Sequence, residues 1–377
     1  MTTSKLILWS TVLPFLTGTL AAQDTAVAAT IAQFASEIQH DVEADGIGSI
    51  AAAVTVGGRV VWADAFGLMD RDASIPATDS TLYRTGSISK SVTAVTMMRL
   101  VELGVIDLDD PVEQYLPEIR QVHEYRDSTP ITFRHLASHT SGLVREPQLR
   151  NAARGPIEGW EHKIIASVPH TRQRWEPGWR YSYSNIGFGI LGLAISRAAG
   201  QPFTVLVDSL VFQPAGMQTA TFVVSPDEVR HLSLGYDNDD DGDIDATTPA
   251  LEHRGRGYKI PNGGVYATVY DLARFIDLMS GVFADSILSG TALSEILSIQ
   301  TPESETEGYG LGFSLGIDED GSRIAGHGGS VSGYTANIQF DPDRQIGVIL
   351  LRNYQQGETN LGAKARELVR RVSNVEY

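Results

Sequence analysis

The fold and the chemistry of this chain are decided by one short stretch, Thr85-Gly86-Ser87-Ile88-Ser89-Lys90. It stands where a loop signal gives way to a helical run that ends at Leu103, and Gly104 can cap that helix. Ser87 and Lys90 are three residues apart, so on a helix their side chains share a face and can touch. The stretch therefore predicts a hydroxyl and an amine in contact at a helix N-terminus.

A serine beside a lysine can become a nucleophile. The hydroxyl attacks well only when a nearby base takes its proton, and an amine does this only when it is neutral. Moving a lysine pKa from 10.4 to about 7 costs roughly 4 kcal/mol, which desolvation and positive potential must supply. The helix N-terminus supplies part of that potential and aims the Ser87 amide at a forming oxyanion. A serine N-cap beside a solvated Lys90 is the alternative.

Two further stretches place polar groups where a cleft would need them. Tyr183 and Asn185 are two residues apart and lead into an apolar helix predicted for 186–199. Gly326-His327-Gly328-Gly329-Ser330 precedes a predicted strand, and its glycines permit a substrate to approach the backbone closely. Both stretches could face the same cleft as Ser87.

In order and spacing, these motifs resemble those of the serine β-lactamase and penicillin-binding-protein superfamily, in its class C-like branch. The three motifs are Ser87-x-x-Lys90, Tyr183-x-Asn185 and His327-Gly328-Gly329. The likeness continues through Leu82 to Ile119, Ile131 to Leu143 and Asn262-Gly263-Gly264, and it covers nearly the whole mature chain.

The resemblance implies a two-step acyl transfer. Ser87 would attack a carbonyl while Lys90 accepts its proton. Tyr183 would pass a proton to the leaving group and help to activate the deacylating water. Asn185 would hold Lys90 and the substrate carbonyl, and the amides of Ser87 and Ser330 would form the oxyanion hole, each worth about a hundred- to a thousandfold in rate. The implied substrate-binding residues are Asn185, His327, Gly328, Gly329 and Ser330.

The third motif departs from the lactam-hydrolysing members, which carry Lys-Thr-Gly and use its cation to bind the substrate carboxylate. His327 has a usual pKa near 6.5 and is mostly neutral at pH 7. We therefore expect a serine hydrolase for small esters or amides, related to enzymes that act on β-lactams or D-amino-acid peptides. A penicillin-binding protein or D-Ala peptidase with slow turnover is the alternative.

The two ends of the chain predict strands, and the middle predicts helices. Runs at 49–56 and 59–66 flank Gly57-Gly58, and runs at 336–340 and 345–351 flank the turn residues 341–344. Apolar stripes predict one helix before the first pair of strands and one after the second. Their residues are Ile31, Phe34, Ala35, Ile38 and Val42, then Leu361, Ala365, Leu368, Val369 and Val372.

The expected fold class is α+β and β-lactamase/transpeptidase-like. It has an antiparallel sheet built from both chain ends and flanked by helices, with a helical lobe inserted between them. We expect one hydrolase domain over 23–377, with an α/β lobe at about 23–80 and 256–377 and a helical lobe at about 81–255.

Residues 1–22 have the layout of a secretory signal peptide, with Lys5, an apolar run from Leu6 to Leu20 and then two alanines. The run is short for a stable membrane anchor, so we expect a periplasmic or secreted protein. The chain of 377 residues has no cysteine, which excludes disulfides and thiolate chemistry. Its net charge of −17 argues against nucleic-acid partners.

Several other motifs receive different interpretations. Ser314 lies in a G-x-S-x-G pattern typical of α/β-hydrolases, but turn residues follow instead of a helix, so it is a remote alternative nucleophile. The stretch 146–151, which begins with Glu146, is similar to the deacylating loop of class A β-lactamases but precedes Tyr183, and we interpret it as a loop. His135 and His139 are expected to be structural. Tyr181 is expected at the cleft edge.

No cofactor is expected for catalysis. The acidic run from Asp237 to Asp245 fits the first nine positions of a calcium loop, although Thr248 occupies the twelfth, where a glutamate belongs. It predicts a weak structural Ca²⁺ site without a catalytic role.

Overall fold

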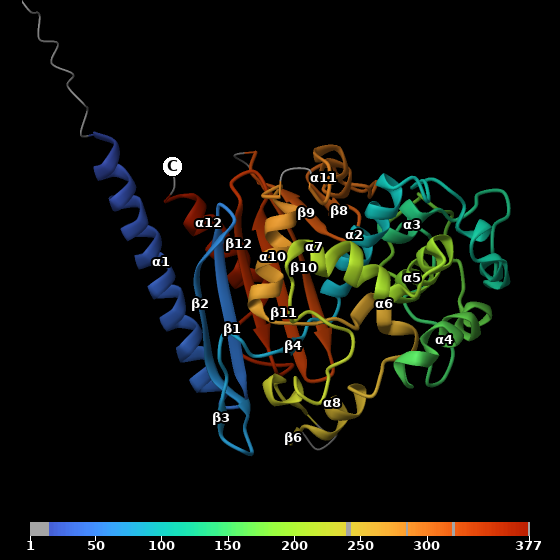
Figure 1. Cartoon of the computed structure of the whole chain (residues 1–377). Coiled ribbons are helices and arrows are strands. Elements are labelled where there is room, and N and C mark those ends of the chain that lie inside the picture. Colours follow the sequence, from blue (N-terminus) through green and yellow to red (C-terminus); the bar gives the residue numbers. More distant parts are fainter. Residues whose placement is uncertain (1–14, 239–242, 284–285, 319–320, 376–377) are drawn as a thin grey trace, which may run out of the picture.

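Both ends of the chain meet in one antiparallel sheet in the computed structural model of the protein (Figure 1). The structure describes residues 15–238, 243–283, 286–318 and 321–375. Within these ranges the large sheet has the strand order β3-β2-β1-β12-β11-β10-β9-β8. Its strands are β1 (Ser49–Val56), β2 (Arg59–Asp70), β3 (Ile75–Pro76), β8 (Glu307–Tyr309), β9 (Ser314–Ile317), β10 (Arg323–Val331), β11 (Tyr334–Asp341) and β12 (Ile346–Arg352).

Helices cover the two faces of this sheet. Side chains alternate along β1, so Ile50 and Val54 pack against α1 (Phe15–Asp45) and α12 (Leu361–Ser373). Ala51 and Ala53 belong to the larger core on the other face. That face carries α10 (Val269–Met279) and α2 (Ile88–Glu102), and Figure 1 shows the helices between residues 133 and 207 on the far side of α2 from the sheet.

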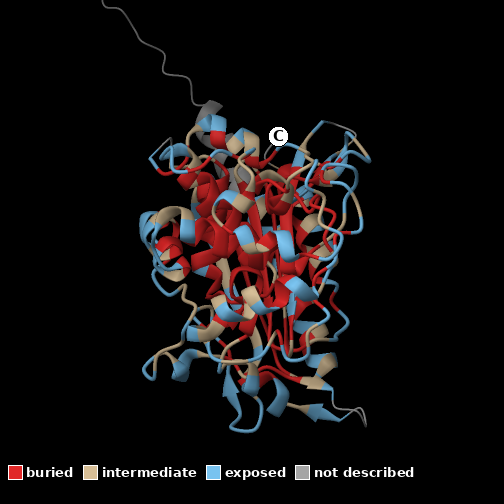
Figure 2. Ribbon diagram, turned by 90° about the vertical axis from the view of Figure 1, so that its right-hand side faces the viewer, coloured by how far each residue is buried: buried red, intermediate tan, exposed pale blue. Residues whose placement is uncertain are grey.

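The remaining helices and short strands form the lobe beside the sheet and the connections to it. They are α3 (Phe133–Ala137), α4 (Trp160–Ser167), α5 (Asn185–Ala199), α6 (Phe203–Val207), α7 (Gln213–Ala215), α8 (Thr247–Glu252), α9 (Ile260–Gly263), α11 (Gly290–Ile296), β4 (Tyr83–Arg84), β5 (Asp237–Asn238), β6 (Ile244–Asp245) and β7 (Tyr266–Ala267). Most of α5 is buried, as are α2 and the centre of the sheet (Figure 2). The Ser87 helix therefore lies between the sheet and the helical lobe.

The predicted sheet and its flanking helices are confirmed. β1 and β2 form the first hairpin, and β11 and β12 form the second. The two hairpins are joined by the pairing of β1 with β12, in which Ile50 lies opposite Arg352 and Val56 opposite Ile346. Gly46 ends α1 at a positive φ of 62°. Val42, predicted to lie on the apolar stripe of that helix, is buried.

The predicted place of the third motif is wrong, because His327-Gly328-Gly329 lies inside strand β10 and not before a strand. Glycine usually weakens a strand, but here pairing with β11 holds residues 325–331 in register. A Cβ at Gly326 would collide with the carbonyl oxygen of Ile338, and a Cβ at Gly329 with that of Thr85. Close packing on both sides therefore requires glycines in this strand.

The α/β-hydrolase alternative is also wrong. Ser314 is the first residue of β9, where it pairs with Gly326 and Tyr309, so it lies on a strand between two others. A nucleophile elbow needs a strand-to-helix turn.

Two predictions fall wholly or partly on undescribed residues. Residues 1–14 of the expected signal peptide and residues 239–242 of the expected calcium loop lie outside the described ranges. Both stay predictions. Within the described ranges, no single helix combines the length and apolar character needed to cross a membrane. Helix α5 and the helical segment 203–215 are long and apolar enough only when taken together, and they are bent by 82° relative to each other.

Candidate active site

Ser87 and Lys90 are in direct contact at the start of α2. Lys90 donates a hydrogen bond from Nζ to Ser87 Oγ over 2.9 Å, and a second one to the backbone carbonyl of Asn262 over 3.2 Å. Ser87 is the N-cap residue of the helix, so its hydroxyl stands at the positive end of the helix dipole. The lysine is completely buried, while Ser87 is partly exposed to an incoming substrate.

The surroundings of Lys90 favour its neutral form. Burial lowers the pKa of this amine well below its usual value, and the cations of Lys259, Arg145 and Arg256 lower it further. Glu146 acts in the opposite direction, with a smaller effect. Because a neutral amine can accept a proton and an ammonium cannot, this environment suits Lys90 to act as a base toward Ser87.

Tyr183 stands against both residues. The Lys90 amine lies 4.8 Å from the centre of its ring, and the Arg145 guanidinium lies 4.9 Å from it. Burial raises the pKa of the phenol, while its hydrogen bond with Ser87 and the charge of Arg145 act the other way. The phenol therefore stays protonated at neutral pH and can exchange a proton with the serine.

Strand β10 approaches the serine from the opposite side. Its pairing with β9 stops at Gly326, so residues 328–330 have no β9 partner and pack against residues 85–87. A Cβ at Gly86 would lie 2.7 Å from the Ser330 nitrogen, and a Cβ at Gly329 would lie 3.1 Å from the Ser87 nitrogen. The two amide nitrogens are thus brought to one place, as an oxyanion hole requires.

His327 does not replace the missing lysine cation. Its ring is buried, with Nε2 2.8 Å from the Tyr309 hydroxyl and Nδ1 2.7 Å from the Gly328 carbonyl oxygen. Burial and the neighbouring Lys90 lower its pKa to about 3, so the imidazole is neutral at pH 7. The ring is therefore held by Tyr309 and Gly328 and brings no positive charge to a substrate.

Asn185 makes different contacts from those expected. Its side-chain amide donates to Glu146 Oε1 over 2.6 Å, and its backbone carbonyl accepts a hydrogen bond from Asn262 Nδ2 over 2.9 Å. The expected hold on Lys90 is instead supplied by the Asn262 carbonyl. Asn185 and Lys90 are therefore linked through Asn262.

Glu146 belongs to the site although the sequence placed it in a plain loop. Besides Asn185, its carboxylate accepts a hydrogen bond from the Tyr258 hydroxyl and forms an ion pair with Lys259 at 3.3 Å. The interpretation as a loop overlooked this role because position 146 precedes the Tyr183 motif. The available signals were the similarity of residues 146–151 to a deacylating loop and the charged pair Arg145-Glu146 directly after the apolar residues 143–144.

The remaining candidates lie around this centre. His139 is buried with its ring 4.1 Å from that of Tyr183, and its Nδ1 accepts a hydrogen bond from the Ser184 amide. His135 instead closes a capping box with Thr132 at the start of α3. Tyr181 is 37% exposed, at the cleft edge. Both histidines are therefore structural: His135 caps α3, and His139 packs against the Tyr183 ring and binds the backbone amide of Ser184.

The sheet with its inserted helical lobe and the serine–lysine pair at a buried helix start define the class of serine hydrolases that includes β-lactamases and penicillin-binding proteins. The chain belongs to the Beta-lactamase family, whose sequence model matches residues 34–371. It is an enzyme of the serine hydrolase type found in that family.

Individual relatives span most of the chain. The D-alanyl-D-alanine-carboxypeptidase/endopeptidase AmpH of Escherichia coli K12 is 29% identical over 79% of this chain and 78% of its own length. The octameric penicillin-binding protein homologue from Pyrococcus abyssi is 27% identical, with a TM-score of 0.71 over 86% of this chain and 73% of that one. EstCE1, a hydrolase with promiscuous acyltransferase activity, is 21% identical and has a TM-score of 0.71. The match covers 92% of this chain and 99% of that one, and it shows a common fold.

Proposed function

We propose that this protein is an exported serine hydrolase that forms an acyl-enzyme on Ser87 and hydrolyses small esters or amides. The observation that carries the proposal is the 2.9 Å hydrogen bond between Ser87 Oγ and the fully buried amine of Lys90. The signal-like residues 1–22 support export.

The first half of the reaction follows from the geometry. Ser87 Oγ attacks the carbonyl carbon, and its proton passes to the neutral amine of Lys90. The amides of Ser87 and Ser330 stabilise the negative oxygen of the tetrahedral intermediate. When this intermediate collapses, the bond to the leaving group breaks, and the leaving group takes the proton held by Lys90, which passes through the Tyr183 phenol and leaves the amine neutral again. The acyl group remains as an ester on Ser87.

The second half repeats these steps with water. A water oxygen attacks the ester carbonyl, and one proton of that water passes through the Tyr183 phenol to the neutral amine of Lys90. The same two amides hold the second tetrahedral oxygen. Collapse returns the proton to Ser87 Oγ and releases a carboxylic acid. Asn185, held by Glu146, borders the position of the substrate carbonyl.

Slow turnover of a peptide-like substrate is the second candidate function. The relative AmpH is named as a D-alanyl-D-alanine carboxypeptidase and endopeptidase, which favours a D-amino-acid peptide. The neutral His327 argues in the other direction, because it offers no cation for a terminal carboxylate. The ester is therefore the first choice of substrate.

A substrate panel and an adduct map test the proposal together. Initial rates on a p-nitrophenyl ester, a chromogenic cephalosporin and a D-Ala p-nitroanilide rank the three substrate classes, and we expect the ester to be turned over fastest. Tryptic mass mapping after treatment with a fluorophosphonate should find the adduct on Ser87. Ser87→Ala should abolish turnover, whereas the control Ser314→Ala, on exposed β9, should change it by less than about threefold. An adduct on another residue would refute the mechanism.

A further inference from the structure

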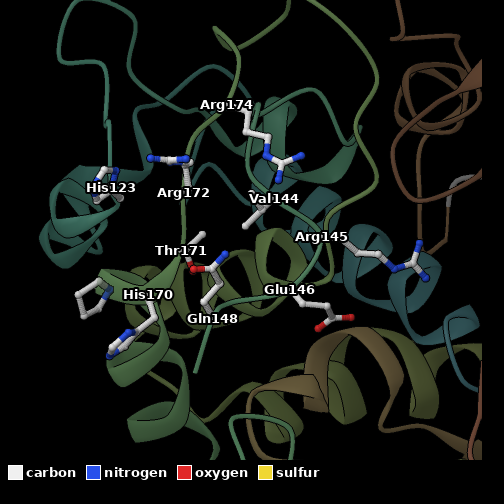
Figure 3. Close-up of a pocket in the computed structure, with 10 residues that line it drawn as sticks. His123, Val144, Arg145, Glu146, Gln148, His170, Thr171, Arg172 and Arg174 are labelled. Atoms are coloured by element: carbon white, nitrogen blue, oxygen red, sulfur yellow. The ribbon is translucent and has the colours of Figure 1, made fainter. Parts of the chain in front are cut away.

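A cavity of about 520 Å³ lies beside the catalytic residues, in the helical lobe (Figure 3). Its walls are formed mainly by two segments, 144–148 and 169–174. Arg145, Arg172 and Arg174 line it, and of the described lining residues Glu146 alone carries a carboxylate. The cavity is therefore rich in positive charge, in a protein whose net charge is −17.

Two of the three arginines lack an acidic partner. Arg172 pairs with Glu124 at 3.0 Å. Glu146 is already occupied by Lys259, Asn185 and Tyr258. Over the described ranges, no carboxylate lies within ion-pair distance of Arg145 or Arg174. Their charges are thus available to a ligand.

The backbone holds the two walls of the cavity together. The amide of Val144 donates to the carbonyl of Arg172 over 2.9 Å, and the amide of Arg174 donates to that of Gly142 over 2.7 Å. The guanidinium groups therefore project from paired extended segments. A pre-arranged pair of cations binds an anion at a lower ordering cost than two free side chains.

The cavity borders the catalytic centre at residues 145–146, which line it and also contact Tyr183 and Asn185. The Arg145 guanidinium lies over the Tyr183 ring, and the Arg145 carbonyl accepts a hydrogen bond from the Asn185 amide over 2.9 Å. In Figure 3 the side chains of Arg145 and Glu146 extend in the same direction, away from His123 and Arg172. An acyl group bound at Ser87 and passing Asn185 would thus meet Arg145 first, and Arg174 belongs to the segment that pairs with residues 142–144 beside it.

We propose that Arg145 and Arg174 form an anion subsite that selects substrates whose acyl part carries a carboxylate. A guanidinium matches a carboxylate in charge and in the spacing of its donors. The inference rests on the proposed function, since it names the substrate class of the same site. Arg145 and Arg174 belong to segments outside β10, so the subsite differs in place from the third-motif cation of lactam-hydrolysing relatives.

A matched pair of esters tests this subsite. The probes are p-nitrophenyl hydrogen glutarate, whose acyl end is a carboxylate, and its neutral methyl ester. The kcat/KM values are measured for the wild type, Arg174→Gln and the control Arg59→Gln, which removes the same charge from an exposed residue of β2. Equilibrium dialysis of both esters against Ser87→Ala, with and without Arg174→Gln, measures binding without turnover.

We expect the wild type to prefer the charged ester about fivefold, the scale of exposed ion pairs, with a preference that falls at high salt. Arg174→Gln should reduce the preference to nearly one, and Arg59→Gln should leave it as it is. Equal use of the two esters by the wild type, or a preference that survives Arg174→Gln, overturns the subsite. If neither ester is hydrolysed but Ser87→Ala binds the charged one in an Arg174-dependent way, the subsite stands and the proposed reaction falls.

Discussion

The amine of Lys90 lies over the face of the Tyr183 ring, 4.8 Å from its centre, while it donates a hydrogen bond to Ser87. The ring face and the phenol oxygen therefore have separate duties. The face is attractive to a lysine that has just received a proton. The oxygen hydrogen-bonds with the serine.

Replacing Tyr183 with phenylalanine separates these duties. The ring face remains over Lys90, so the amine should keep its lowered pKa and the acid limb of the kcat/KM profile should stay in place. Loss of the proton-carrying oxygen should lower kcat by about a hundredfold or more. Stopped-flow and steady-state assays over a pH series measure both effects. A shifted acid limb with an unchanged kcat would contradict this division.

Lys90→Arg should nearly abolish acylation. A guanidinium does not lose its proton in a protein, so it cannot accept the proton of Ser87. The fluorophosphonate adduct should form on the variant at less than about one hundredth of the wild-type rate, because general base catalysis is worth at least that factor. Circular dichroism and the melting temperature show whether the larger side chain has disturbed the fold. An active, folded variant would refute Lys90 as the base.

Lys259→Gln should move the acid limb of the rate profile to higher pH. The cation of Lys259 is the largest charge effect lowering the pKa of Lys90. Without this cation the pKa of the Lys90 amine rises, so a higher pH is needed to produce the neutral amine that acts as the base. Because Lys259 is partly exposed and screened, we expect a shift of about half a pH unit. Lys163→Gln, on the exposed side of α4, is the charge-matched control and should cause no shift.

Buried neutral histidines should make the fold sensitive to acid. His327 has a folded pKa of about 3 against an unfolded value of about 6.5, so the unfolded chain binds the proton more readily between these two values. The free energy of unfolding should therefore decrease as the pH falls from about 6.5 toward 3, by about 1.4 kcal/mol per pH unit for this residue. In His327→Asn the slope measured by urea titration should be smaller by that amount. An identical slope would show that His327 is protonated in the fold.

The sequence revealed those parts of the site that depend on local spacing. A spacing of three residues on a helix brings Ser87 to Lys90, and the Ala/Val-rich runs on either side of Gly57-Gly58 define a hairpin. Contacts between distant segments left no such pattern. Asn185 meets Glu146 across 39 positions of the chain, and Lys90 meets the Asn262 carbonyl across 172. Neither contact is accompanied by a hydrophobic periodicity or a turn motif that could be recognised in the sequence.

The strand position of the third motif shows a different limit. Glycine has a low intrinsic preference for strands, so local propensity placed His327-Gly328-Gly329 before a strand, whereas the motif lies inside β10. Glycine is needed at position 329 because the carbonyl oxygen of Thr85 occupies the space that a side chain would fill. This reason becomes visible only when residues 85–87 lie next to the strand.

The contact between Gly329 and the loop before α2 also fixes when the protein can first work. A growing polypeptide carries its serine and lysine early, but the second amide of the oxyanion hole is synthesised only near the end. Until that strand has left the ribosome and joined β11, the proposed oxyanion hole has only the Ser87 amide and lacks its second donor. The order of synthesis would therefore keep unfinished chains from hydrolysing substrates at the full rate.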